Sequence, residues 1–239
     1  MDRRYAVYAT PARHTALARW GSAWLGRDAE TGAELTRRAL PGWSIDDIAR
    51  ITAFPRSYGL HATLKPPFRL RPQQSEAALI EAMAGFAAAR TAPCPARLRI
   101  AALGNFLALV PESEAGDLCR LADSCVESFD RFRAPPSEAE LARRRSASLS
   151  PREEEHLDRW GYPYVFDTFR FHITLSGPLA AEERDRLREA LREPLAPILA
   201  EPLQVADVAL FVQKRDAPFR LARRFPFSSS IGCRGAGGR

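Results

Sequence analysis

Hydrophobic and polar residues alternate along several short stretches of this chain, and such alternation predicts half-buried β-strands. Residues 5–9 alternate in this way, and residues 96–110 are typical of two strands that turn at Gly104-Asn105. Further strands are predicted over residues 203–213 and 219–225. The chain is therefore expected to contain antiparallel sheets with one face turned to a core.

Between the strands, apolar residues recur at the spacing of helices that bury one stripe. Ser44 and Ser75 stand where N-cap residues belong, directly before two of these segments. Trp20, Trp24 and Trp43 are interpreted as core residues. The expected helices cover residues 15–25, 44–50, 75–90, 115–129 and 181–191.

The stretch 133–160 differs in composition from its surroundings. It holds Pro135-Pro136, the arginine run 143–145, and Pro151 followed by three glutamates within a charged segment. Charge of both signs on a helical stretch is typical of a solvated surface. We expect an exposed helical connector, with the arginine run in solvent rather than on nucleic acid.

One short motif, H-x-T-L, occurs twice, at residues 61–64 and 172–175. The chain has only four histidines, so two chance matches to this pattern are improbable. Successive side chains of a strand point to opposite faces, which places His61 beside Thr63 and His172 beside Thr174. Each motif therefore presents an imidazole and a hydroxyl on one face, opposite an apolar face.

Both motifs are followed by a proline-containing stop, then a helix, then two strands, which indicates an internal duplication. We expect an α+β fold of two lobes related by a pseudo-twofold, with an antiparallel sheet in each lobe, helices outside and a central cleft between the histidines. A single bilobal domain is predicted over residues 1–232, and a flexible glycine-rich tail over 233–239.

Composition narrows the class of protein. The 239 residues are 46% hydrophobic, which suffices for a substantial core, and the net charge of +6 favours phosphorylated or nucleic-acid partners. The four cysteines have no C-x-x-C spacing, and the histidines are not spaced with them as metal ligands are. No metal or other cofactor is therefore expected. No leader or apolar stretch of membrane-spanning length is seen, which favours a cytoplasmic, soluble monomer with reduced thiols and no membrane partner.

Two histidines that face one another can divide the work of acid and base, because imidazole titrates near neutrality. Such a pair would suit the opening of a cyclic phosphodiester in a small substrate without a metal, with the roles of acid and base left open between His61 and His172. Thr63 and Thr174 would donate hydrogen bonds to the non-bridging phosphate oxygens. Further possible ligand contacts, on the same strand faces or on flanking segments, are Lys65, Arg170, Tyr8, Arg56, Tyr58 and Gln213.

The paired motifs resemble those of the two-histidine phosphoesterase superfamily, which includes RNA ligase-like cyclic phosphodiesterases. The longer stretches Tyr58–Phe68, Trp24–Asp28 and Phe169–Leu179 resemble an uncharacterised bacterial family associated with phosphonate metabolism, and the likeness spans Arg4 to about Phe227. The resemblance implies a bilobal fold without an obligatory metal, catalytic roles for His61 and His172, and phosphate binding by Thr63 and Thr174. It also suggests a ribosyl 1,2-cyclic phosphate as the substrate.

Two alternatives remain open. RNA ends that carry 2′,3′-cyclic phosphates would be favoured by the basic charge, and processing of RNA would depend on salt and on oligonucleotide length. A non-catalytic nucleotide- or RNA-binding protein would keep its affinity after both histidines are lost and would turn over no substrate. Loss of hydrolysis in either His61→Ala or His172→Ala would favour the phosphoesterase.

Overall fold

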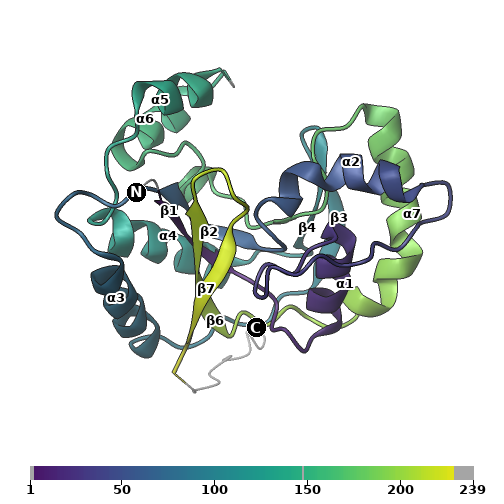
Figure 1. The fold of residues 1–239 in the computed structure, drawn as a ribbon, viewed down its shortest axis with the longest axis horizontal. Helices are drawn as coiled ribbons and strands as arrows, with labels where there is room; N and C mark the ends of the chain where they lie inside the picture. The colour runs from purple at the N-terminus through teal and green to yellow at the C-terminus, as the bar shows by residue number, and fades with distance from the viewer. Residues whose placement is uncertain (1–2, 147, 229–239) are drawn as a thin grey trace, which may run out of the picture.

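The strands of this chain form one antiparallel sheet rather than two. The computed structural model describes residues 3–146 and 148–228. Its strands are β1 (Arg3–Ala9), β2 (Ala62–Phe68), β3 (Leu98–Leu103), β4 (Phe106–Pro111), β5 (Ile173–Thr174), β6 (Asp207–Lys214) and β7 (Arg220–Pro226). They lie in the order β3-β4-β5-β2-β1-β6-β7, so the expected pair of separate sheets is corrected to a single one (Figure 1). The short strand β5 makes the connection, because it pairs with β4 on one side and with β2 on the other.

The helices confirm most of the predicted segments. Thr15, Ser44 and Ser75 are N-caps whose hydroxyls accept hydrogen bonds from the first turns of their helices. Two helices run further than expected, since α2 continues to Arg56 and α7 to Leu199. The helices are α1 (Ala16–Leu25), α2 (Ile45–Arg56), α3 (Glu76–Ala88), α4 (Gly116–Asp130), α5 (Glu138–Arg145), α6 (Pro151–Trp160) and α7 (Ala181–Leu199), with a 3₁₀ turn at Phe166–Thr168.

One face of the sheet is covered by helices. Helix α4 packs on β2, α3 on β6 and β7, and α7 on β3 and β4. The main core lies between the sheet and these helices and includes Leu64, Ile173 and Leu109 of the sheet. Trp24 and Trp43 are also buried in this core, as predicted. The opposite face holds a smaller buried cluster of Ala6, Tyr8, Ala209, Phe211 and Phe219. We call this opposite face the cavity face.

Pro66 and Pro67 do not end β2, contrary to the sequence prediction. The strand continues to Phe68, which pairs with Tyr5, but the register against β1 shifts between Tyr5 and Val7 and again before Tyr8. A proline has no N–H for the ladder, and such gaps are accommodated by bulges. The prediction assumed regular alternation, which would place Lys65 on the same face as His61 and Thr63. Because of this irregularity, Lys65 lies on the opposite face.

The predicted connector is helical but not fully exposed. Helix α5 buries none of its residues, whereas α6 buries His156 and Leu157. Figure 1 shows α5 and α6 together at one end of the molecule. None of the helices within the described ranges is long and apolar enough to cross a membrane. The predicted tail at 233–239 lies outside the described residues.

Candidate functional site

The two H-x-T-L motifs lie side by side in the middle of the sheet. Ala62 of β2 is directly opposite Ile173 of β5 in an antiparallel pair. Because the strands are pleated, the residues on either side of this pair point to the cavity face. The antiparallel register places His61 across from Thr174, and His172 across from Thr63. The structure brings His61, Thr63, His172 and Thr174 to the walls of one cavity.

Both imidazoles are held by the same main-chain contact. The Nδ1 atom of His61 lies 2.8 Å from the carbonyl oxygen of Gly59, and that of His172 lies 2.7 Å from the carbonyl oxygen of Arg170. A carbonyl oxygen only accepts, so each Nδ1 carries the hydrogen and donates it. In the neutral ring, Nε2 is then the unprotonated nitrogen. In the first motif, this Nε2 lies 3.2 Å from Oγ1 of Thr63, whose hydroxyl can donate to it.

The carbonyl that holds His61 depends on a glycine. Gly59 has φ = +80°, a left-handed conformation that favours glycine. A Cβ at this position would lie 2.5 Å from Cβ of Ala29. Backbone conformation and close packing thus both favour glycine two residues before His61.

Burial lowers the pKa of both histidines. For His61, loss of hydration is the main cause, the nearby His172 adds to it, and the Gly59 carbonyl opposes it, which leaves the pKa at about 4. For His172, loss of hydration also lowers the pKa, opposed by the Arg170 carbonyl. Both rings are therefore neutral at pH 7 in the free protein, and each can accept a proton when an anion approaches.

The cavity around the motifs has a volume of about 570 Å³, within the range of small-molecule sites. Its lining combines the two motifs with three arginines, several aromatic rings and no carboxylate among the described residues. Such a lining favours an anion, because guanidinium groups and hydroxyls are good donors to phosphate oxygens. The residues outside the motifs that line it are Arg4, Tyr8, Phe54, Pro55, Tyr58, Pro66, Pro67, Phe106, Arg143, Arg144, Tyr162, Tyr164, Ser176, Gly177 and Pro178.

Aromatic rings flank both imidazoles. Tyr8 stacks on His61 with ring centroids 3.8 Å apart, and Tyr58 lies at 6.0 Å from the same ring. On the other strand, Phe106 lies at 5.8 Å from His172. Tyr8 and Tyr58, two of the predicted ligand contacts, thus line the cavity, and their contact with a ligand stays a prediction.

Lys65 and Arg56 do not reach the cavity. Lys65 is buried against α4, where its Nζ donates to the carbonyl oxygen of Val126 and to Oδ1 of Asp130, at 3.1 and 3.2 Å. The β2 irregularity explains this position on the helix-covered face. Arg56 instead pairs with Glu34 on the surface. Their expected contacts with a ligand are corrected accordingly.

Gln213 and Arg170 lie beside the cavity rather than in it. The side-chain oxygen of Gln213 accepts a hydrogen bond of 2.7 Å from Nε of Arg4, and its amide nitrogen donates to the Ala217 carbonyl. Gln213 therefore positions an arginine of the cavity. Arg170 contributes its carbonyl to His172, while its side chain lines an adjoining cavity.

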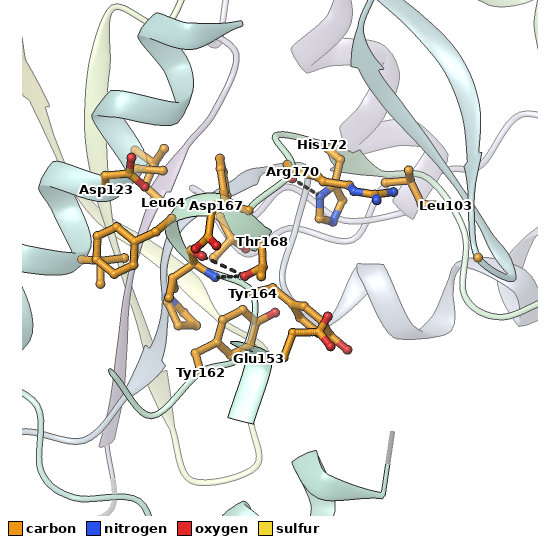
Figure 2. A pocket seen from close by; sticks show the side chains of 18 of the residues that line it. Leu64, Leu103, Asp123, Glu153, Tyr162, Tyr164, Asp167, Thr168, Arg170 and His172 are labelled. Atoms are coloured by element: carbon orange, nitrogen blue, oxygen red, sulfur yellow. Dashed lines mark hydrogen bonds between the residues drawn. The ribbon is translucent and has the colours of Figure 1, made fainter. Parts of the chain in front are cut away.

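This adjoining cavity, of about 470 Å³, shares Thr63, His172, Tyr162 and Tyr164 with the first. Figure 2 shows His172 and Arg170 on one side of it and the two tyrosines on another. The two spaces therefore meet where Thr63 of the first motif and His172 of the second line both.

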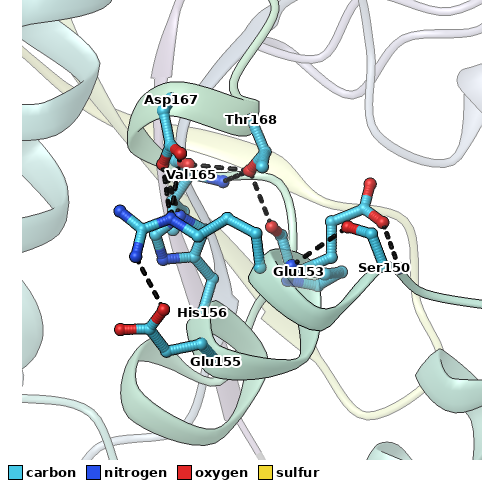
Figure 3. A network of polar contacts seen from close by, with 9 residues as sticks. Ser150, Glu153, Glu155, His156, Val165, Asp167 and Thr168 are labelled. Carbon is cyan, nitrogen blue, oxygen red and sulfur yellow. Dashed lines mark hydrogen bonds and ion pairs between the residues drawn. The ribbon is translucent and has the colours of Figure 1, made fainter.

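A polar network holds the segment that carries these tyrosines. His156 of α6 lies with Nε2 2.7 Å from Oδ1 of Asp167, and Arg152 donates to the same carboxylate at 2.9 Å (Figure 3). These partners, with Arg152 the larger cause, lower the pKa of Asp167 to about 2. The hydroxyl of Thr168 closes the turn by donating to the carbonyls of Pro163 and Val165. The network fixes the 3₁₀ turn and α6 beside the site.

Several cavity residues were missed by sequence reasoning. Arg4 shares the alternation of β1 with Tyr8 and could have been found from it. Arg143 and Arg144 belong to the run interpreted as solvated, and no local signal places that run beside residues 61–64 and 172–175. Within the described ranges, no group of three or more His, Cys, Asp or Glu side chains could hold a metal ion.

Comparison with curated proteins identifies relatives of this chain. It is 38% identical over 231 residues to "Ribose 1,5-bisphosphate phosphokinase PhnN" of Janthinobacterium sp. (strain Marseille), covering 94% of this chain and 51% of the relative. It is 39% identical over 222 residues to a protein of the same name from Laribacter hongkongensis (strain HLHK9), covering 92% of this chain and 51% of the relative. The chain thus spans about half the length of these relatives.

These names correct the expected activity. A phosphokinase transfers a phosphoryl group, whereas the sequence analysis expected a hydrolase of the two-histidine type that opens a cyclic phosphodiester. The expectations of a hydrolase and of a cyclic phosphodiesterase are therefore wrong by this comparison.

A structure and a family model complete the comparisons. A conserved protein of unknown function from Agrobacterium tumefaciens strain C58 is 15% identical, with a TM-score of 0.46 over 94% of this chain and 87% of the other. The model of a family described as "Protein of unknown function (DUF1045)" matches residues 63–220. This match includes Thr63, the whole second motif and most of the sheet. Because it covers more than half of the sequence, the chain belongs to this family.

Proposed function

We propose that this chain binds a phosphorylated ribose in the two-histidine cavity, with one phosphate group between His61 and His172. The observation that carries the proposal is the part of the cavity lining where two imidazoles and two threonine hydroxyls lie together, in a lining without a carboxylate among the described residues. A phosphate in this position would be the strongest available partner for those donors. The names of both relatives contain a phosphorylated ribose, which supports the same ligand class.

The histidines are suited to a ligand that brings negative charge. Each Nδ1 is occupied by a main-chain carbonyl, so Nε2 is the nitrogen left for a ligand. A phosphate dianion favours the protonated ring, and Nε2–H then donates to a phosphate oxygen. The hydroxyls of Thr63 and Thr174 donate to the remaining oxygens from the same sheet face.

We further propose that the chain is related in motif and architecture to the two-histidine superfamily and acts in phosphonate metabolism. The repeated contact between Nδ1 and the carbonyl two residues earlier supports a common origin of both motifs. The ring-opening hydrolysis typical of that superfamily is not part of this proposal.

We propose that these 239 residues supply sugar-phosphate binding rather than phosphoryl transfer. The relatives are about twice as long as the match, and the 239 residues contain no G-x-x-x-x-G-K-[ST] phosphate loop. With ATP and ribose 1,5-bisphosphate as probes, we expect no ATP consumption above that of a protein-free control. Turnover that His61→Asn abolishes would overturn this assignment.

Isothermal titration calorimetry at pH 7 with ribose 5-phosphate and with unphosphorylated ribose tests the binding proposal. We expect ribose 5-phosphate to bind and ribose not to bind. His61→Asn and His172→Asn should each weaken binding by about tenfold or more, the usual effect of losing one hydrogen bond to a charged group. His14→Asn is the matched control, because His14 is exposed and does not line the cavity. Equal affinity for both sugars, or binding unchanged in both histidine variants, contradicts the proposal.

A further inference from the structure

Three arginines of the cavity lack a carboxylate partner. Arg4 donates to the neutral amide of Gln213, and Arg144 lies over the ring of Tyr162 at 4.5 Å. No ion pair is found for Arg4, Arg143 or Arg144 among the described residues. Guanidinium groups gathered around one cavity without a counter-charge favour an anionic ligand.

The next residue of the same helix provides a contrast. Arg145 pairs with Glu154 at 3.0 Å and with Asp158 at 2.7 Å, both on α6, and it does not line the cavity. Arg145 thus pairs with carboxylates of α6, whereas Arg143 and Arg144 line a cavity whose described lining residues include no carboxylate. Burial is the main cause that lowers the pKa of Arg144, and the charge of Arg143 adds to it, while Tyr162 and Glu140 oppose the shift.

Helix α5 is fixed at the edge of this space by contacts at both ends. Near its start, Glu140 accepts two hydrogen bonds from the guanidinium of Arg69, at 3.0 and 2.8 Å. Glu140 also accepts a hydrogen bond from the backbone N–H of Ser137, the N-cap residue of α5. At its end, Arg145 joins it to α6. Arg143 and Arg144 therefore approach the cavity from a wall separate from the sheet that carries the two motifs.

Arg4 is also separated from the histidines. Tyr8 is paired with Thr63, and Arg4 lies four residues earlier on the same face of β1. At about 3.3 Å per residue, this separation is about 13 Å along the strand. A phosphate between the imidazoles therefore leaves room for a second anionic group closer to the arginines.

We infer that Arg143 and Arg144, together with Arg4, form a second phosphate-binding position, so that the cavity takes a sugar bearing two phosphate groups. This inference rests on the proposed function, since it assigns the first phosphate to the two motifs. It specifies the ligand as a sugar bisphosphate rather than a monophosphate. Gln213 is then a positioning residue, because it orients the Arg4 guanidinium.

Calorimetric titration with ribose 5-phosphate and ribose 1,5-bisphosphate tests the inference. The wild-type chain should bind the bisphosphate at least about tenfold more tightly, as expected for one additional set of charge-assisted hydrogen bonds. The double substitution Arg143→Gln with Arg144→Gln should remove this preference and change the affinity for ribose 5-phosphate by less than about threefold. Arg145→Gln is the matched control and should keep the wild-type preference. Circular dichroism and thermal unfolding check that each variant folds.

The possible failures are distinguishable. If neither sugar phosphate binds the wild-type chain, the proposed function fails. If both bind with equal affinity and His61→Asn weakens both, the first position stands and the second is overturned. If the bisphosphate is preferred but the double variant keeps that preference, or loses both ligands equally, the assignment of Arg143 and Arg144 to a second phosphate is overturned.

Discussion

The indole nitrogen of Trp24 donates a hydrogen bond of 2.8 Å to the carbonyl oxygen of Leu175, the last residue of the second motif. Both residues are buried, so this contact ties α1 to the end of the short strand β5. Beyond it, the Gly177 N–H donates to the Ile51 carbonyl of α2 at 2.7 Å. Helices α1 and α2 thus supply hydrogen bonds that a two-residue strand cannot make within the sheet.

Trp24→Phe should destabilise the chain by about 1–3 kcal/mol, because it leaves the buried Leu175 carbonyl without its donor. Urea unfolding monitored by circular dichroism measures the change. Trp20→Phe is a suitable control, since Trp20 stacks on Trp24 with ring centroids 5.5 Å apart and is only partly buried. Equal losses in the two variants would show that ring area rather than the hydrogen bond matters.

The pKa values of His61 and His172 should rise when a phosphorylated ligand binds. In the free protein, NMR titration should place the pKa of His61 near 4 and that of His172 below 6.5. Ribose 5-phosphate should raise the pKa of both, because a dianion stabilises the imidazolium. A ligand-bound protein whose histidine pKa values do not move would contradict a phosphate between the rings.

The same values predict how stability changes with pH. Between about pH 6.5 and pH 4 the unfolded chain protonates its histidines while His61 in the native state stays neutral. The unfolded state then binds more protons, so the free energy of unfolding decreases as the pH falls through this window. His61→Asn should flatten this part of the dependence, as measured by urea unfolding at several pH values. An unchanged slope would show that His61 does not have a lowered pKa.

The threonine hydroxyls should contribute to affinity without contributing much to folding. Thr63→Val and Thr174→Val should each weaken the binding of ribose 5-phosphate by about five- to tenfold, the effect of one lost hydrogen bond. Thr63→Ser and Thr174→Ser keep the hydroxyl and should retain most of the affinity. If the serine and valine variants bind equally well, the hydroxyls do not contact the phosphate.

The Lys65–Asp130 pair should affect stability chiefly when the buried ammonium loses its carboxylate, and it should not affect binding. Its burial lowers its pKa to about 8, although Asp130 opposes the shift. In Lys65→Met, Asp130 keeps Arg133 at 2.7 Å, so the free energy of unfolding should change by less than about 1 kcal/mol. Asp130→Ala leaves the buried ammonium without its carboxylate and should cost about 3 kcal/mol. Both variants should bind ribose 5-phosphate as the wild type does, and a loss in Lys65→Met alone would return Lys65 to the site.

Local patterns predicted much of this structure. The hairpin of β3 and β4 follows from the Gly104-Asn105 turn, and the shared face of a histidine and the threonine two residues later follows from the strand period. The N-caps at Ser44 and Ser75 are likewise local. Each of these features depends on residues close in the sequence.

Features that depend on distant partners escaped prediction. The single sheet arises because Ile173 pairs with both Ala62 and Leu109, and neither partner is signalled by the motif itself. The face of Lys65 depends on how β1 accommodates two prolines of β2. The arginine run was predicted to be solvated because its partners come from later segments. Tyr162 lies beside Arg144, and Glu154 pairs with Arg145.

The carbonyl groups of residues 59 and 170 make the same contact with a histidine, but the two positions differ in which amino acids they accept. A main-chain acceptor survives a change of its own side chain, so position 170 can drift among amino acids while the tautomer of His172 stays fixed. Position 59 offers the same acceptor but tolerates no such drift, since its backbone conformation and the contact with Ala29 exclude a side chain. The two motifs of the site are therefore open to different degrees of mutational change.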